Sequence, residues 1–410
     1  SLKSYQKTLL DILRASINKK KFDCRYNITQ WEELINEAKE HNISSLIYYT
    51  LSKDTLQGID STLLNEWKKE AIMSNIIQIN HIKQMYNVIL ELKKENIEII
   101  ILKGLVLRKL YPRPELRTMG DADILVKVDD YKNVKECLSK LGYVSSNHNN
   151  TIHEGFICSG NLEIEVHNKL INNDFIYVDN NKFEDELWSK KTIVEFNGVS
   201  TNTLSKEDFL IHLCFHMAVH TKAIGYGIRQ LYDLTLFLIN NINEIKWIEF
   251  EEKLSQYGLL KYVQGLIMLI DKIFYMNISD RFTKDNNIQD KEINLLLENI
   301  MMSGVHGKKH LNEDFQILYK SSNKHKDDQA LIRRFLRFLF PHKGTLIYEY
   351  GEKYSYINNN IILIPVAWTD RIFNGILKKY GLINTINQIK YCLIIIRMRR
   401  NIIKSFSIPN

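Results

Sequence analysis

Cysteine, proline and long apolar runs are scarce in this chain of 410 residues, and each scarcity excludes a class of structure. The five cysteines are scattered, odd in number and include no C-x-x-C pair, which argues against a disulfide framework and a structural zinc site. The five prolines leave helices with few breaks. The longest apolar runs, at 361–368 and 392–396, fall far short of the ~20 residues of a membrane span.

The first residues also lack a signal-peptide pattern, because Lys3, Lys7 and Asp11 interrupt any apolar run. We therefore expect a cytoplasmic protein. The net charge of +7 suits an anionic ligand and does not require nucleic acid. The chain contains no P-loop, no Rossmann glycine triplet, no G-x-S-x-G elbow and no protein-kinase motif set, which removes the common alternatives for nucleotide chemistry.

Hydrophobic periodicity divides the chain into three parts. Residues 1–95 predict an N-terminal helical subdomain, residues 96–203 a compact α/β core, and residues 204–410 a C-terminal helical subdomain. In the core we expect one helix at 131–141, ended by Gly142, and four strands, at 97–102, 122–128, 152–158 and 162–167. The last two strands flank a turn at 159–161. The predicted fold class is therefore α+β.

The C-terminal part begins with a helix-start signature, Ser205 followed three residues later by Asp208. Four helices are expected there, near 205–222, 226–241, 246–276 and 290–302. We expect residues 303–330 to form a loop or exposed segment. A further helical stretch should follow over 331–405, broken near Pro341 and near 358–360.

Two pairs of acidic residues carry the strongest chemical signal. Asp121 and Asp123 stand two apart at the start of a predicted strand, so both side chains point to one face. Glu163 and Glu165 share a face of a later strand in the same way. Carboxylates this close repel each other unless a cation lies between them, and Mg²⁺ prefers such oxygen ligands. The alternative is a solvated loop with two acidic residues.

Lys103-Gly104 lies between the first strand and a short helical pattern, seventeen residues before Asp121. A glycine there lets a phosphate approach the backbone, and a helix N-terminus offers free N–H groups and partial positive charge. A triphosphate could therefore bind between this turn and the acidic strand.

Several motifs together resemble a bacterial family of uncharacterised nucleotidyltransferases within the polymerase-β nucleotidyltransferase superfamily. The resemblance rests on Leu102-Lys103-Gly104, Leu110-Tyr111-Pro112, the run Arg117–Asp123 and Glu165-Val166-His167. Weaker similarity continues through residues 204–208, 212–216, 231–234 and 363–365, and so spans most of the chain.

The resemblance implies a small mixed-sheet polymerase-β-like core flanked by helices, and an enzyme that moves a nucleoside monophosphate from a triphosphate to an acceptor. Asp121, Asp123 and Glu165 would be the catalytic metal ligands for Mg²⁺ or Mn²⁺, with Glu163 as the neighbour of Glu165. The acceptor would be a hydroxyl or phosphate of a small molecule or peptide rather than long nucleic acid. Two alternatives remain open: transfer of a glycosyl or other group from a nucleotide-activated donor, and a non-catalytic nucleotide-binding module.

One departure concerns the phosphate site. Most superfamily members have Gly-Ser or Gly-Gly where this chain has Gly104-Leu105. Lys103 could compensate as a point charge on phosphate, and Arg117, just before Gly120 and the aspartates, could do the same. We therefore expect Lys103, Gly104, Arg117 and Gly120 to bind the nucleotide, with a surface cation as the alternative for Arg117.

A row of three histidines, His212, His216 and His220, stands at helical spacing on one face. We expect packed histidines or a substrate contact there rather than a zinc site, since no H-E-x-x-H signature is present. Arg229 and Asp233, one turn apart, are expected to form a helix ion pair or to line the same cleft. His167 follows Glu165 closely enough to orient a metal-bound carboxylate or to contact substrate.

Overall fold

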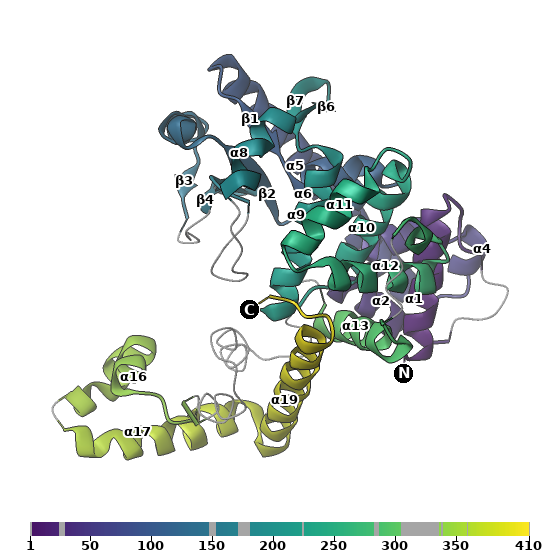
Figure 1. Cartoon of the computed structure of the whole chain (residues 1–410). Coiled ribbons are helices and arrows are strands. Elements are labelled where there is room, and N and C mark those ends of the chain that lie inside the picture. The colour runs from purple at the N-terminus through teal and green to yellow at the C-terminus, as the bar shows by residue number, and fades with distance from the viewer. Residues whose placement is uncertain are drawn as a thin grey trace.

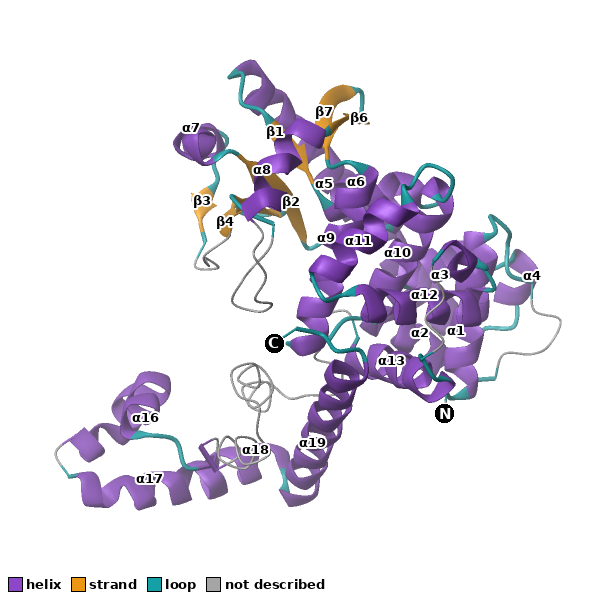
Figure 2. Ribbon diagram, in the orientation of Figure 1, coloured by secondary structure: helices purple, strands orange, loops and turns teal. Residues whose placement is uncertain are grey.

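The structure is a computed structural model that describes residues 2–23, 29–146, 153–170, 181–223, 225–282, 287–304 and 336–409, except residues 338 and 359. It contains one sheet at one end of the molecule, a large helical body, and a helical arm that projects from the body (Figure 1). Figure 2 shows that the strands lie together at one end of the molecule and that the rest of the chain is mostly helical. The prediction of an α+β fold is confirmed.

The chain opens with helices, as predicted for the first part of the sequence. Their bounds are α1 Ser4–Ile17, α2 Trp31–Glu40, α3 Ser44–Thr50, α4 Lys53–Leu56 and α5 Ser61–Lys94. The longest, α5, begins where the Asp60 carboxylate accepts hydrogen bonds from the backbone N–H groups of Thr62 and Leu63. Its second half leaves the helical body and packs on the sheet (Figure 1).

The sheet has seven strands in the order β3-β4-β5-β2-β1-β7-β6. The strands are β1 Ile99–Ile101, β2 Asp121–Val126, β3 Val144–Ser145, β4 His153–Ile157, β5 Glu163–His167, β6 Thr192–Phe196 and β7 Val199–Thr203. Four of them, β1, β2, β4 and β5, were predicted. The hairpin of β6 and β7 and the short β3 were missed. The helices of this region are α6 Lys103–Leu107, α7 Tyr131–Lys140 and α8 Asn181–Lys190.

Strand alternation separates the two faces of the sheet. Ala122, Ile124 and Val126 of β2 join a hydrophobic core with α5 and α7 on one face. Asp121, Asp123 and Leu125 therefore point to the other face, and Leu125 belongs to the core of the helical body. The same pleat that builds the core thus directs both aspartates toward the helices α9 (Lys206–Lys222) and α10 (Ile228–Asn241).

The helices that follow are α9 Lys206–Lys222, α10 Ile228–Asn241, α11 Trp247–Gln256, α12 Leu260–Phe274 and α13 Asp290–Ser303. Ser205 caps α9 by accepting a hydrogen bond from the Asp208 backbone at 3.2 Å, which confirms the predicted start. The single helix predicted over 246–276 was wrong. It is divided into α11 and α12 at Gly258, whose φ of +66° lies outside the right-handed helical region.

The arm consists of helices α16 Lys343–Tyr350, α17 Ile364–Asp370, α18 Lys378–Tyr380 and α19 Leu382–Ser405, the last of which leads back to the body. A small core of Leu346, Tyr354, Ile357 and Ala367 holds its outer part together. The predicted breaks near Pro341 and 358–360 fall between helices. The predicted loop at 303–330 lies outside the described residues beyond position 304. In the described part of the chain, no helix combines the length and apolarity that crossing a bilayer would need.

Candidate active site

The two acidic pairs of the sequence lie on adjacent strands in register. Strands β2 and β5 run parallel, with Asp121 opposite Glu163 and Asp123 opposite Glu165. Paired residues of neighbouring strands point to the same face, so four carboxylates share one face of the sheet. Asp123 is buried, with 4% of its surface exposed, and lies beside the Glu165 side chain. The strand pairing brings together the acids that the sequence places more than forty residues apart.

Lys103 supplies the nearest positive charge. Its Nζ lies 2.8 Å from Asp123 Oδ1, in a pair that is largely buried. The backbone of Lys103 has φ +38°, a left-handed conformation that costs about 1–3 kcal/mol in a residue with a side chain. Burial alone would lower the pKa of Lys103, but the carboxylates of Asp123, Glu165 and Asp121 outweigh it and raise the pKa. Lys103 is therefore a charged ammonium held against Asp123.

The surroundings shift the pKa values of the two aspartates in opposite directions. Burial opposes a charge on Asp123, yet Lys103 and His167 hold the pKa of Asp123 well below its usual range. The pKa of Asp121 rises to about 6, because surrounding protein atoms disfavour its charge and Asp123 and Glu165 repel it. Asp121 nevertheless keeps exposed surface on the cavity side. Around Asp121, the neighbouring carboxylates thus outweigh the nearby cations, a situation that a divalent cation relieves.

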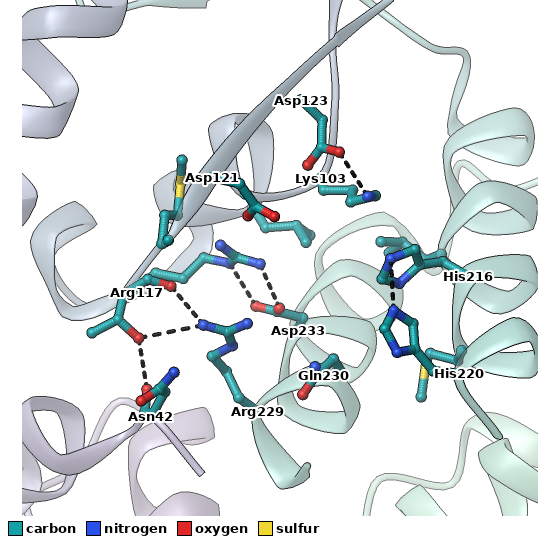
Figure 3. A pocket seen from close by; sticks show the side chains of 17 residues that line it. Asn42, Lys103, Arg117, Asp121, Asp123, His216, His220, Arg229, Gln230 and Asp233 are labelled. Atoms are coloured by element: carbon teal, nitrogen blue, oxygen red, sulfur yellow. Dashed lines mark hydrogen bonds and ion pairs between the residues drawn. The ribbon is translucent and has the colours of Figure 1, made fainter. Parts of the chain in front are cut away.

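A cavity of roughly 300 Å³ lies beside the aspartates, between the sheet, α9 and α10. In Figure 3, Asp121 lies between the Lys103–Asp123 pair and the Arg117–Asp233 pair, and His216 and His220 face the cavity from α9. The N-terminal helices contribute Asn42. The predicted residues that line the cavity are Lys103, Gly104, Arg117, Gly120, Asp121, Asp123, His216, His220, Arg229 and Asp233.

Arg117 is buried and paired rather than a surface cation. Its guanidinium donates to both carboxylate oxygens of Asp233, at 3.0 and 2.8 Å, and Tyr111 donates to Asp233 Oδ1 at 2.8 Å. The bidentate pair fixes the segment before β2 against α10. Asp233 therefore pairs with Arg117. Of the two arrangements that the sequence left open for Arg229 and Asp233, the structure shows the shared cleft, because both residues line the cavity.

Polar contacts hold the loop that precedes the aspartates. Gln78 of α5 accepts from the Met119 backbone N–H at 3.0 Å and donates to the Met119 carbonyl at 3.2 Å. Arg229 donates to the Thr118 carbonyl at 2.8 Å, and the Thr118 hydroxyl donates to the Asn42 carbonyl at 2.8 Å. Three separate parts of the chain thus fix the backbone that positions Asp121.

The space beside the Gly104 Cα is filled by other side chains of the protein. A Cβ at this position would lie 2.3 Å from Arg117 Nη1 and 2.7 Å from Met119 Sδ. Gly120 differs, because a Cβ there would meet no atom within 4 Å. The glycine between strand and helix therefore allows the Arg117 guanidinium and Met119 to pack over the backbone of α6.

The histidine row shares one face of α9, as predicted. His216 Nε2 and His220 Nε2 are 3.1 Å apart, within hydrogen-bond distance. Burial lowers the pKa of His212 to about 3 and that of His216 well below its usual value, and the nearby Lys103 ammonium adds to both shifts. Both rings are therefore neutral, and the nitrogens of His216, which lines the cavity, can accept or donate hydrogen bonds to a ligand there.

A family described as uncharacterised nucleotidyltransferases matches residues 27–275, which include the sheet, the aspartates, the cavity and the helices around it. The chain belongs to this family. No curated protein matches the chain. Membership makes this chain a nucleotidyltransferase by family, with a nucleotide as the implied substrate, and it confirms the resemblance inferred from the sequence motifs.

Not every candidate residue of this nucleotidyltransferase reaches the cavity wall. Glu163, Glu165, His167 and His212 lie outside its lining. Glu163 instead accepts a hydrogen bond from the Ser146 hydroxyl at 3.0 Å. His167 Nε2 lies 2.8 Å from Asp123 Oδ1, so it contacts the aspartate directly as well as following Glu165 in the sequence.

His153 of β4 was missed by the sequence analysis. It lies opposite His167 in the β4–β5 hairpin, and its Nε2 is 3.7 Å from Glu165 Oε1. The signal was present, because a hairpin centred on the predicted turn at 159–161 pairs positions 153 and 167. Asn42, Thr118 and Gln230 were also missed, since nothing in their local sequence distinguishes them from ordinary polar residues.

Proposed function

We propose that this chain transfers a nucleoside monophosphate from a nucleoside triphosphate to a hydroxyl or phosphate of a small-molecule or peptide acceptor, through a polymerase-β-like core. Asp121 and Asp123 would hold Mg²⁺ or Mn²⁺, with Glu165 as the third carboxylate. The observation that carries the proposal is the parallel register of β2 and β5, which puts Asp123 beside Glu165 on the face that meets the cavity.

The donor set fits a divalent metal. Burial disfavours a charge on Asp121, and repulsion by Asp123 and Glu165 outweighs the attraction of Lys103 and Arg229, so the pKa of Asp121 rises to about 6. Carboxylate oxygens are the ligands that Mg²⁺ takes, usually together with water and substrate phosphates. When bound, such ions neutralise the charge of the triphosphate and of the leaving pyrophosphate.

Cations around the cavity supply the remaining phosphate contacts. Among the described residues, Arg229 has no carboxylate at ion-pair distance, although burial and the neighbouring Arg117 lower its pKa. A buried guanidinium without an acidic partner is stabilised by an anion. Arg229 would therefore bind the triphosphate, and Lys103 would exchange Asp123 for a phosphate oxygen. Asn42 and Gln230 would contact the base, the sugar or the acceptor.

The reaction would be an in-line displacement. The acceptor oxygen forms a bond to the α-phosphorus, the bond between that phosphorus and pyrophosphate breaks, and the acceptor proton passes to water. The protein would contribute mainly by positioning both substrates and by stabilising negative charge. The neutral imidazole of His216 and the neighbouring ring of His220 would orient the acceptor from α9.

The test uses nucleoside triphosphates with radioactive α-phosphorus. Each of the four bases is tried in turn, with panels of peptides and small molecules as acceptors. We expect the wild-type protein to label an acceptor and to release pyrophosphate only when Mg²⁺ or Mn²⁺ is present. Asp123→Asn should lower the rate at least ~100-fold, as the loss of one electrostatic contact to the transition state does in other enzymes. Asp129→Asn, an exposed acid just after β2, is the matched control.

Full activity of a folded Asp123→Asn protein would reject the catalytic assignment. Acceptor labelling from a nucleotide-sugar labelled in the sugar, with no transfer of α-phosphorus, would replace nucleotidyl transfer by glycosyl transfer. Metal-dependent triphosphate binding without pyrophosphate release over the whole panel would identify a binding module.

A further inference from the structure

His153, Glu165 and His167 form a cluster of possible metal ligands beside the aspartates. Their ligand atoms all lie within 4.8 Å of one another. Glu165 Oε1 is 3.7 Å from His153 Nε2, and Glu165 Oε2 is 3.5 Å from His167 Nε2. Two ligands ~2.1 Å from a tetrahedral zinc ion lie ~3.4 Å apart, so both imidazole–carboxylate distances are close to those of a shared ion.

The sheet fixes this arrangement. His153 and His167 are paired across β4 and β5, and Glu165 follows the same face two residues before His167. The residue opposite Glu165 is Gly155, where a Cβ would lie 2.4 Å from Ser146 Oγ and 2.5 Å from Glu163 Oε1. The missing side chain leaves room for the Ser146 hydroxyl and the Glu163 carboxylate beside the strand. Since β-strands hold these positions, the ligands need only small side-chain rotations to meet.

We propose that His153, His167 and Glu165 bind Zn²⁺ next to Asp123. Imidazole nitrogen suits Zn²⁺, whereas Mg²⁺ and Mn²⁺ prefer oxygen ligands. Three protein ligands leave a coordination position open, as in catalytic rather than structural metal sites. Asp123 Oδ1, 2.8 Å from His167 Nε2, is close enough to connect this ion with the Asp121/Asp123 pair.

The cluster is also accessible. The side chains of His153 and Glu165 expose 17% and 20% of their surface, whereas His167 exposes 5%. An ion can therefore reach the site from solvent and be held against a buried ring. The inference rests on the proposed function only in its use of Glu165 as a metal ligand; it requires no nucleotidyl transfer.

The experiment measures Zn²⁺ binding to the metal-free protein by calorimetry, and the visible absorption of Co²⁺ as a probe of imidazole ligation. We expect one tight Zn²⁺ site and a Co²⁺ spectrum with nitrogen ligands. His153→Ala removes a metal ligand and should weaken Zn²⁺ binding about 100-fold or more. Loss of a residue that only hydrogen-bonds to a ligand typically weakens metal binding 10–100-fold. His342→Ala, which removes an exposed histidine of the arm, is the matched control.

Asp121→Asn separates this proposal from the proposed function. It should abolish Mg²⁺-dependent triphosphate binding and leave the Zn²⁺ site in place. Glu165→Gln provides a second ligand variant should His153→Ala fail to fold. Absence of stoichiometric Zn²⁺ binding, or unchanged Zn²⁺ affinity in a folded His153→Ala protein, would overturn the proposal. Zn²⁺ binding without any triphosphate binding would reject the proposed function alone.

Discussion

Lys103 combines a strained backbone with a buried charge, and both suit a role at the proposed metal site. Its ammonium is 2.8 Å from Asp123 Oδ1, the place where a divalent cation would neutralise the aspartate. A bound metal and the ammonium would therefore compete for the same carboxylate. Positive φ at a non-glycine residue persists only where the surroundings hold it, and such residues gather at functional sites.

This competition gives a prediction for Lys103→Met. In the absence of nucleotide, Mn²⁺ should bind about 10-fold more tightly, because the competing ammonium is gone; such a change corresponds to ~1.4 kcal/mol. Triphosphate affinity should fall in the same variant, since a phosphate contact is lost. Manganese titration by electron paramagnetic resonance measures the first effect. Lys109→Met, an exposed lysine six residues later, is the control, and weaker Mn²⁺ binding in Lys103→Met would refute the competition.

Residue-level prediction from the sequence succeeded where the signal was local. The spacing of Asp121 and Asp123 on one strand predicts their shared face, and the structure confirms it. The partner of Arg117 could not be found in this way, because Asp233 lies 116 residues further along the chain. Long-range pairs of this kind depend on how helices dock, which short motifs do not encode.

At the scale of single elements, Gly104 shows that the turn between β1 and α6 needs a glycine for packing. Gly104→Ala should destabilise the protein by about 1–3 kcal/mol, because the added methyl overlaps Arg117 Nη1 and Met119 Sδ. This loss exceeds the gain of up to ~1 kcal/mol that alanine brings inside a helix. Urea denaturation followed by circular dichroism measures the difference.

Gly120→Ala is the matched variant in the same loop. A Cβ at Gly120 has open space, so its unfolding free energy should stay within ~0.5 kcal/mol of wild type. Equal stability of the Gly104→Ala and Gly120→Ala proteins would contradict the packing argument.

The elements themselves were predicted unevenly. Strands β1, β2, β4 and β5 carry β-branched runs or alternating patterns between clear turns, and the sequence shows them. The β6–β7 hairpin was missed, because its residues at 192–203 mix threonine, asparagine and serine with few apolar side chains. The break between α11 and α12 was missed because the apolar periodicity continues on both sides of Gly258.

At the scale of the whole molecule, the first helices and α9–α13 share one hydrophobic core. Helix α1 packs against α12, and the buried hydroxyls of Ser16 and Tyr232 lie 2.8 Å apart. Arg14 Nε also donates to the Ile273 carbonyl at 3.2 Å. Helices that precede and follow the sheet in the chain thus form one body beside it. Sequence periodicity showed that these helices exist and could not show that they pack together.

The shared core predicts a far-reaching effect of Leu13→Ala. The side chain of Leu13 is fully buried in α1, so its truncation should cost about 2–5 kcal/mol. Because the core is common, amide hydrogen exchange should quicken in α10 and α12 as well as in α1–α3. Ile248→Ala, at a position that is 78% exposed, should leave exchange unchanged. Faster exchange confined to the first three helices would indicate separate cores.

The central claim is that Asp121 and Asp123 bind a metal–triphosphate complex in the cavity between the sheet, α9 and α10. The most direct measurement is a crystal structure of the protein with Mn²⁺ and a non-hydrolysable triphosphate, with the ions located by anomalous scattering. We predict Mn²⁺ ~2.1–2.2 Å from carboxylate oxygens of Asp121 and Asp123, with the triphosphate within hydrogen-bond distance of Arg229 and Lys103. A triphosphate bound elsewhere, or Mn²⁺ absent from both aspartates, would contradict the account.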